Sequence, residues 1–217
     1  MILEANLKKS TLALSALTLA LAAGLSACGG GSSSYTIGGV VVGLEYPGLV
    51  LSNNGEDLPI APAGMETVPG TSVSVPKNVE YAFKNQVDYG DPYEVTVKAQ
   101  PLHQECVQAG GNVDTAGRLS VINAVISCRL NDYTVGGTIT GLTSGGLTLI
   151  NGTEGGTVDI PANAEKFVFS KEVFYNETFG ITVLKQPEGL TCTVSNGAGI
   201  MKDEAVTTVA VACRPNT

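Results

Sequence analysis

An internal repeat fills most of this 217-residue chain. Two copies of one pattern follow each other, which indicates two copies of one structural unit. We therefore predict two tandem domains, at 35–130 and 133–217. Five landmarks of the first copy return in the same order in the second: YTIGGVVVGL at 35–44 as YTVGGTITGL at 133–142, 48–51 as 146–149, 93–101 as 179–187, Cys106 as Cys192 and Cys128 as Cys213.

The first copy is the longer one. The spacing between equivalent residues falls from 98 to 86 between the second and third landmarks, so copy one carries 12 extra residues there. They lie around Met65–Pro76. Four prolines in this part of the chain argue against a central strand: Pro59, Pro62, Pro69 and Pro76. We expect a longer loop or an added edge hairpin at this point.

Apolar residues alternate with polar ones in both copies. In copy two, Val209, Val211 and Cys213 share one face of an extended segment, a pattern typical of half-buried strands. We predict an all-β protein made of two seven-stranded antiparallel sandwiches, either Ig-like or transthyretin-like in topology. The strands expected in copy two are 133–140, 147–151, 157–160, 165–169, 178–186, 192–196 and 205–213.

Four of the five cysteines form two matched pairs. Four cysteines allow three connectivities, and the repeat favours pairing within each copy. If each pair bridges antiparallel strands, the midpoints fall on turn-like residues, at Gly117 and between Lys202 and Asp203. Their spacing does not fit a zinc site. We therefore predict two disulfides, each closing the last hairpin of its domain: Cys106–Cys128 and Cys192–Cys213.

The first 27 residues have the features of a secretion signal. Lys8 and Lys9 precede the uncharged run 10–25, and small residues follow. The run is short and rich in Ala and Ser for a membrane-spanning helix. Leu25-Ser26-Ala27-Cys28 resembles the bacterial lipobox, which implies that Cys28 becomes a lipid-carrying first residue. The alternative is an ordinary signal peptide in which Cys28 has no role.

The segment after this cysteine supports a membrane tether. Residues 28–34 read CGGGSSS, which is typical of a flexible linker. Gly29 in place of aspartate points, by resemblance to enterobacterial sorting, to the outer membrane. We thus expect an extracytoplasmic protein of the bacterial cell envelope, attached to the membrane through lipid on Cys28.

The charge of the mature chain excludes one class of partner. Without residues 1–27 the chain holds 19 acidic and 10 basic residues, a net charge of −9. Such a surface repels phosphate backbones, so we expect no nucleic-acid partner. It also disfavours electrostatic docking on anionic lipid.

The landmarks resemble a repeat of exported bacterial lipoproteins and surface proteins. That repeat has the pattern Y-x-V-G-G-x-V-x-G-L, then G-L-x-L-x-N, V-T-V-x-x-Q-P, C-x-V-x-N-G and a closing V-x-V-x-C. Copy two carries nearly all of it, while copy one has Gln108-Ala109-Gly110 where Asn-Gly is expected. The resemblance implies an Ig-like or prealbumin-like module, without catalytic residues or cofactors.

No catalytic constellation emerges from the residues. The single histidine, His103, corresponds to Gly189 in copy two and is interpreted as a loop residue. Asp88, Asp91 and Glu94 suggest a calcium loop, but solvated turn acids explain them better.

Three tyrosines of copy one provide the one candidate ligand surface. Tyr81, Tyr89 and Tyr93 lie close together in the sequence, and exposed aromatic groups of this kind bind sugars. Alternation also predicts a core position for Tyr81. We expect a non-catalytic envelope lipoprotein whose modules serve as spacer, adhesion or protein-interaction domains. The alternative is a carbohydrate or small-ligand module that uses these tyrosines.

Overall fold

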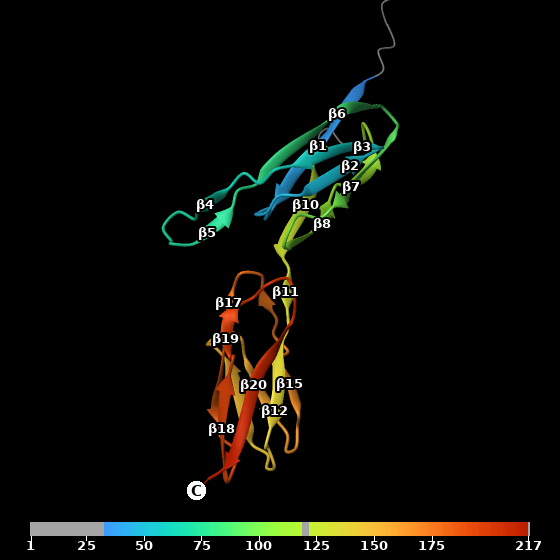
Figure 1. Cartoon of the computed structure of the whole chain (residues 1–217). Coiled ribbons are helices and arrows are strands. Elements are labelled where there is room, and N and C mark those ends of the chain that lie inside the picture. Colours follow the sequence, from blue (N-terminus) through green and yellow to red (C-terminus); the bar gives the residue numbers. More distant parts are fainter. Residues whose placement is uncertain (1–32, 119–121, 217) are drawn as a thin grey trace, which may run out of the picture.

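The chain folds into two all-β bodies that follow one another along an elongated molecule (Figure 1). The structure is a computed structural model, and it describes residues 33–118 and 122–216. The predicted fold class, two tandem β-sandwiches, is confirmed. The signal segment 1–27 and Cys28 lie outside the described residues.

The first sandwich consists of two four-stranded sheets and one added hairpin. Buried residues from both sheets form one continuous core, which includes Ile37, Leu51, Val95 and Ile126. The first sheet has the order β6 (Val79–Asp88), β1 (Ser34–Val42), β10 (Ala124–Leu130) and β8 (Gln104–Gly110), and the second has the order β3 (Glu56–Ile60), β2 (Leu49–Asn53), β7 (Pro92–Ala99) and β9 (Val113–Thr115).

The second sandwich repeats this order strand by strand. The repeat in the sequence is therefore a repeat of the whole topology. Its sheets are β15 (Lys166–Val168), β12 (Val135–Thr140), β20 (Val206–Pro215) and β18 (Leu190–Ser195), facing β14 (Thr157–Ile160), β13 (Leu147–Asn151), β17 (Thr178–Lys185) and β19 (Ala198–Ile200), with a short extra pair of β11 (Asp132–Tyr133) and β16 (Val173–Phe174).

Period-two burial builds the two cores. Leu49 and Leu51 on β2 are at most 1% exposed, and Leu147 and Leu149 on β13 are fully buried. Their neighbours along each strand are half-buried, as the alternation predicts. Complete burial of one such leucine contributes about 1.5–3 kcal/mol, so these strands anchor the second sheet of each sandwich.

Two details differ from the prediction. Each sandwich has eight strands in its two sheets, where seven were predicted. The additional strand is β9 in the first sandwich and β19 in the second, and each has three residues, which is too short to show alternation. The first and last strands pair in parallel, β1 with β10 and β12 with β20. Parallel neighbours need a crossover connection, which no local pattern reveals.

The doubled glycines of the repeat allow a close approach between first and last strands. A Cβ atom at Gly39 would lie 1.9 Å from the carbonyl oxygen of Ala124, and one at Gly137 would lie 1.8 Å from that of Val209. Any side chain at either glycine would push the parallel pair apart. The Gly-Gly motif is therefore a packing requirement.

The extra residues of copy one form a hairpin outside both sheets. Strands β4 (Met65–Thr67) and β5 (Ser74–Pro76) pair with each other alone, and Figure 1 shows them projecting from the first sandwich. All three residues of β4 are exposed. This is the hairpin expected from the longer spacing.

Candidate functional site at the junction of the sandwiches

Both predicted disulfides are present. Cys106 joins Cys128 with an S–S distance of 2.02 Å, and Cys192 joins Cys213 at 2.03 Å. In each pair the two residues lie directly opposite each other on antiparallel neighbours. Disulfides form and persist in oxidising compartments, so they indicate an extracytoplasmic location.

The connection between paired cysteines is not the simple hairpin that was predicted. In copy one the chain passes through β9, which joins β7 of the opposite sheet, before it enters β10. In copy two it passes through β19, which joins β17. Each disulfide therefore closes a loop that spans both layers of its sandwich.

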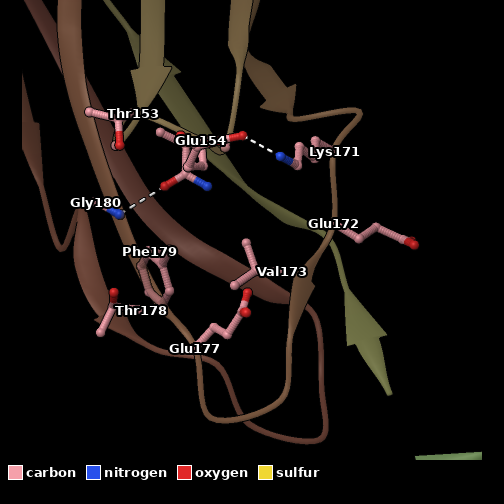
Figure 2. Close-up of a pocket in the computed structure, with 12 residues that line it drawn as sticks. Thr153, Glu154, Lys171, Glu172, Val173, Glu177, Thr178, Phe179 and Gly180 are labelled. Atoms are coloured by element: carbon pink, nitrogen blue, oxygen red, sulfur yellow. Dashed lines mark hydrogen bonds between the residues drawn. The ribbon is translucent and has the colours of Figure 1, made fainter. Parts of the chain in front are cut away.

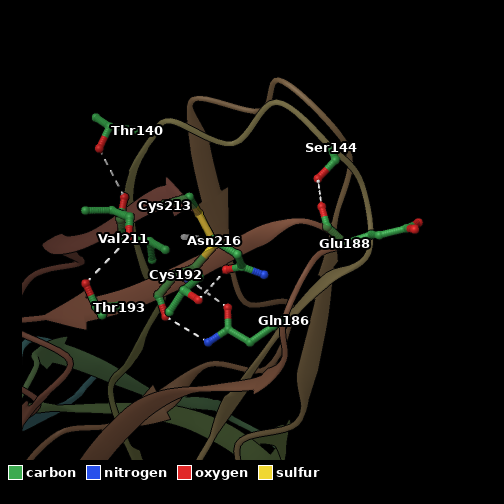
Figure 3. Close-up of a disulfide and its surroundings, with 11 residues drawn as sticks. Thr140, Ser144, Gln186, Glu188, Cys192, Thr193, Val211, Cys213 and Asn216 are labelled. Atoms are coloured by element: carbon green, nitrogen blue, oxygen red, sulfur yellow. Dashed lines mark hydrogen bonds between the residues drawn. A yellow bond between two sulfur atoms is a disulfide. The ribbon is translucent and has the colours of Figure 1, made fainter.

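A glutamine side chain supports each disulfide. The Gln186 amide nitrogen donates to the Cys192 carbonyl at 3.0 Å, and its amide oxygen accepts from the Cys192 N–H at 2.7 Å (Figure 3). Gln100 makes the same pair of bonds to Cys106 at 3.0 and 2.7 Å. The Gln of the Gln-Pro motif thus acts as one more strand partner for the cysteine backbone.

A buried asparagine joins two strands in each copy. Asn53 and Asn151 are 2% and 3% exposed. The Asn151 Oδ1 accepts from the Gly180 N–H at 2.8 Å, and the Asn53 Oδ1 accepts from that of Glu94 at 3.3 Å. The asparagine of the repeat is therefore structural, because buried polar groups need such partners.

The tyrosine surface predicted for copy one does not exist as such. Tyr81 is 8% exposed and Tyr93 is 2% exposed, so both belong to the core. The Tyr81 hydroxyl donates to the Ala124 carbonyl at 2.8 Å, and burial raises its pKa. The Tyr93 hydroxyl donates to the Gly111 carbonyl at 3.2 Å. Tyr89, at 67% exposed, is the one member of the set on the surface.

The most distinctive cluster of side chains lies where the two sandwiches meet. The imidazole of His103 stacks on the ring of Tyr175, with centroids 3.9 Å apart and planes 3° apart. Its Nδ1 lies 2.6 Å from the Asp203 Oδ2. Tyr46 packs edge-on against both rings, with centroids at 4.9 Å from His103 and 5.7 Å from Tyr175. We call these four residues the junction cluster.

A buried glutamine places Tyr46 in this cluster. The Gln104 side chain is 2% exposed, and its amide oxygen accepts from the N–H groups of Glu45 and Tyr46 at 2.8 and 3.0 Å. Its amide nitrogen donates to the Gly43 carbonyl at 2.7 Å. The equivalent residue of copy two is Leu190, which cannot hold a loop in this way. The loop is thus specialised in the copy that faces the junction.

The backbone of His103 adopts a conformation that suits glycine. Its φ is +59°, and the equivalent Gly189 has a φ of +72°. A left-handed conformation costs a residue with a side chain roughly 1–2 kcal/mol. The side chain must therefore compensate by its contacts, and at His103 those contacts are made across the junction.

The linker is held from both sides. Leu130 ends β10 and Asp132 begins β11, so Asn131 alone separates strands of the two sandwiches. Its N–H donates to the His103 carbonyl at 2.9 Å, and its carbonyl accepts from the Tyr175 N–H at 2.8 Å. His103 and Tyr175, whose rings stack, thus also hydrogen-bond to the linker residue through their backbones.

An ion-pair network spans the same point of the chain. The Arg129 guanidinium donates to Glu105 at 2.8 Å and to Asp132 at 3.3 Å. The hydrogen bond that the guanidinium donates to Glu105, and then the one that it donates to Asp132, raise the pKa of Arg129. Asp132 therefore serves as an acceptor for Arg129.

The surroundings of the cluster are acidic and partly desolvated. Burial is the main cause that raises the pKa of Tyr46, followed by the charges of Glu45, Tyr175 and Asp203. Burial also raises the pKa of Glu45.

The end of the second sandwich that carries Tyr175 also contains a hollow of about 350 Å³ (Figure 2). Glu154, Glu172 and Glu177 are among the residues that line it, and the Lys171 ammonium group donates to the Glu154 carbonyl oxygen. Among the described residues, no three histidine, cysteine or acidic side chains are grouped to hold a metal ion.

No protein-family model and no curated protein matches this chain. The structure establishes an all-β protein of two tandem sandwiches with a disulfide in each. Within residues 33–118 and 122–216, no helix has the length and apolar character needed to cross a membrane.

Proposed function

We propose that this protein is a non-catalytic, lipid-anchored spacer of the bacterial cell envelope, whose two sandwiches are joined as one stiff rod. The observation that carries this proposal is the junction cluster. Domains joined by a linker move relative to one another by default, unless specific contacts oppose the motion. Here a linker of one residue, Asn131, is combined with ring stacking and the hydrogen bond between His103 and Asp203.

The magnitudes are sufficient for stiffness. An aromatic pair contributes about 0.5–1.5 kcal/mol beyond its buried area, and three ring contacts meet here. The hydrogen bond between His103 and Asp203, whose side chains are 23% and 45% exposed, adds about 0.5–1.5 kcal/mol. Together with the two hydrogen bonds of Asn131, these contacts favour one orientation of the sandwiches by a few kcal/mol.

The lipid anchor is supported by the cysteines. Four of five are used in disulfides, so the chain folds where thiols are oxidised, and an incidental free thiol at Cys28 would be a liability there. Incorporation of labelled palmitate by the wild-type chain, and its loss in Cys28→Ser, would support the anchor. Equal labelling of both forms would contradict it.

A non-catalytic role is supported by the use of His103. It is the single histidine of the chain, and its ring is engaged by Tyr175, Tyr46 and Asp203. The alternative of a carbohydrate module loses its basis, since Tyr81 and Tyr93 are buried. The exposed hairpin β4–β5 is the element best placed for contact with another protein.

The rod is tested by small-angle X-ray scattering from the body secreted behind an ordinary signal peptide. Tyr175→Ala removes the stacking partner of His103, and we expect a broader distribution of particle dimensions. Tyr89→Ala is the matched control, because Tyr89 is the equivalent residue of copy one and is exposed. A wild-type profile that already requires two independently moving bodies would refute the proposal.

A further inference from the structure

The end of the first sandwich where the chain enters repeats the surface that the second sandwich uses at the junction. The Tyr89 N–H donates to the Ser33 carbonyl at 2.8 Å, as the Tyr175 N–H donates to that of Asn131 at 2.8 Å. The residue after each tyrosine has a positive φ, +91° at Gly90 and +65° at Asn176. Tyr89 and Tyr175 are therefore structural equivalents. We call the surface around Tyr89 the entry face.

The two surfaces differ in what covers them. Tyr175 is half-buried beneath His103 and Tyr46, whereas Tyr89 is 67% exposed. The Tyr89 ring lies over Gly117, where a Cβ atom would be 2.3 Å from it, and beside Tyr35 at a centroid distance of 6.4 Å. The entry face thus presents an aromatic platform to its surroundings.

Charges of both signs flank this platform. The Ala116 N–H donates to the Asp91 backbone carbonyl, as the Met201 N–H donates to that of Glu177, so Ala116 and Met201 are equivalent residues. Two residues further along, Arg118 therefore occupies the position that Asp203 has in the second sandwich. The Arg118 side chain is 75% exposed and lies 3.3 Å from Asp114. Asp88 and Asp91 are among the residues that line a neighbouring hollow of about 520 Å³.

The position of Ser33 limits what can cover the entry face. Cys28 precedes it by five residues, which span at most about 17 Å when extended. If Cys28 carries lipid, this face stays within that distance of the membrane. A second sandwich does not fit in the gap, because a ten-residue strand such as β6 is about 33 Å long. The headgroup layer of the membrane does fit.

We propose that the entry face lies on the membrane and binds phosphoethanolamine headgroups. This inference rests on the proposed lipid anchor. Arg118 supplies a guanidinium for the lipid phosphate, and the hollow with Asp88 and Asp91 accepts the ammonium group. Tyr89 places an amphipathic ring at the membrane–water interface, where tyrosine is favoured. A zwitterionic headgroup matches both charges, whereas anionic lipid is repelled by the acidic chain.

The experiment uses the full lipidated protein in phosphatidylethanolamine–phosphatidylcholine vesicles. The chain contains no tryptophan, so Tyr89→Trp introduces a unique fluorophore at the entry face. We expect its emission to shift to shorter wavelength and to be quenched by lipids with a nitroxide near the headgroup. Leu184→Trp, at a 57% exposed position of the second sandwich, is the matched control and should show neither change.

The outcomes separate this proposal from the anchor on which it rests. Protein that sediments with vesicles but leaves the Tyr89→Trp emission unquenched refutes membrane contact and retains the anchor. Protein that does not sediment refutes both. Quenching that is reduced by Arg118→Gln, and by replacing phosphatidylethanolamine with phosphatidylglycerol, supports the headgroup assignment. Quenching that is equal or stronger with phosphatidylglycerol overturns it, and so does protection of Tyr89→Trp by a bound soluble protein in place of lipid.

Discussion

The imidazole of His103 in the first sandwich lies parallel to the ring of Tyr175 in the second, with centroids 3.9 Å apart. The same two residues hold the linker residue Asn131 through their backbones. One stacked pair therefore couples the side chains and the main chain of the junction.

His103→Gly should loosen the junction between the sandwiches without destabilising the first sandwich. Glycine adopts the φ of +59° without strain, so the free energy of unfolding of the first sandwich should stay the same or rise by about 1 kcal/mol. The ring contacts are lost, so the sandwiches should tumble more independently in NMR relaxation measurements. The reverse change, Gly189→His, is the control and should destabilise the second sandwich by about 1 kcal/mol. Unchanged relaxation in His103→Gly would contradict this account.

Each disulfide should stabilise its own sandwich. Cys192 and Cys213 are 21 residues apart, and a cross-link over a loop of this size contributes about 3 kcal/mol by restricting the unfolded chain. Replacing both with serine should lower the calorimetric transition of the second sandwich and leave the first sandwich folded. Replacing Cys106 and Cys128 with serine should lower the transition of the first sandwich and leave the second sandwich folded. Loss of both transitions in either variant would show that the sandwiches do not fold separately.

Gln186→Ala should destabilise the second sandwich by about 1–3 kcal/mol. The change leaves the N–H and carbonyl of Cys192 without the amide that satisfies both, at 2.7 and 3.0 Å. Chemical denaturation measures the loss, and Gln100→Ala should have the same effect on the first sandwich. A value near zero at both positions would mean that water replaces the amide at no cost.

Tyr81 should make the first sandwich sensitive to alkaline pH. Burial raises the pKa of its hydroxyl, so the native state holds the proton more tightly than the unfolded chain. That stability is fully present below pH about 10 and is lost as pH rises further. Tyr81→Phe should cost about 1 kcal/mol at neutral pH, through the lost bond to Ala124, and should weaken the alkaline loss. An identical pH profile for Tyr81→Phe and wild type would refute the assignment.

Local pattern was enough to predict the elements but not the topology. Strand β13 was predicted at 147–151, and its burial alternates as a half-buried strand requires, with Leu147 and Leu149 in the core. Strand β19 was not predicted, because its three residues, Ala198–Ile200, are too few to show an alternation of apolar and polar side chains. The Gly-Gly motif was visible as a repeat, but its reason appears only when β1 and β10 are placed side by side.

The junction cluster had one usable signal in the sequence. His103 occupies the place that Gly189 holds in the other copy, and such an exchange at a left-handed position marks a side chain kept for its contacts. From the sequence alone, His103 was interpreted as a loop residue. Tyr81 and Tyr93 were grouped with Tyr89 because they are close in sequence, whereas two of the three point into the core.

The amino-acid sequence by itself determined the repeated all-β units and the pairing of the four cysteines, because alternation and repeat spacing act between residues of one unit. Tertiary structure alone decided the junction. His103 and Asp203 are 100 residues apart, and nothing local to either predicts the other. Their contact depends on how the end of one sandwich docks on the next, which is set by the one-residue linker and the shapes of both ends.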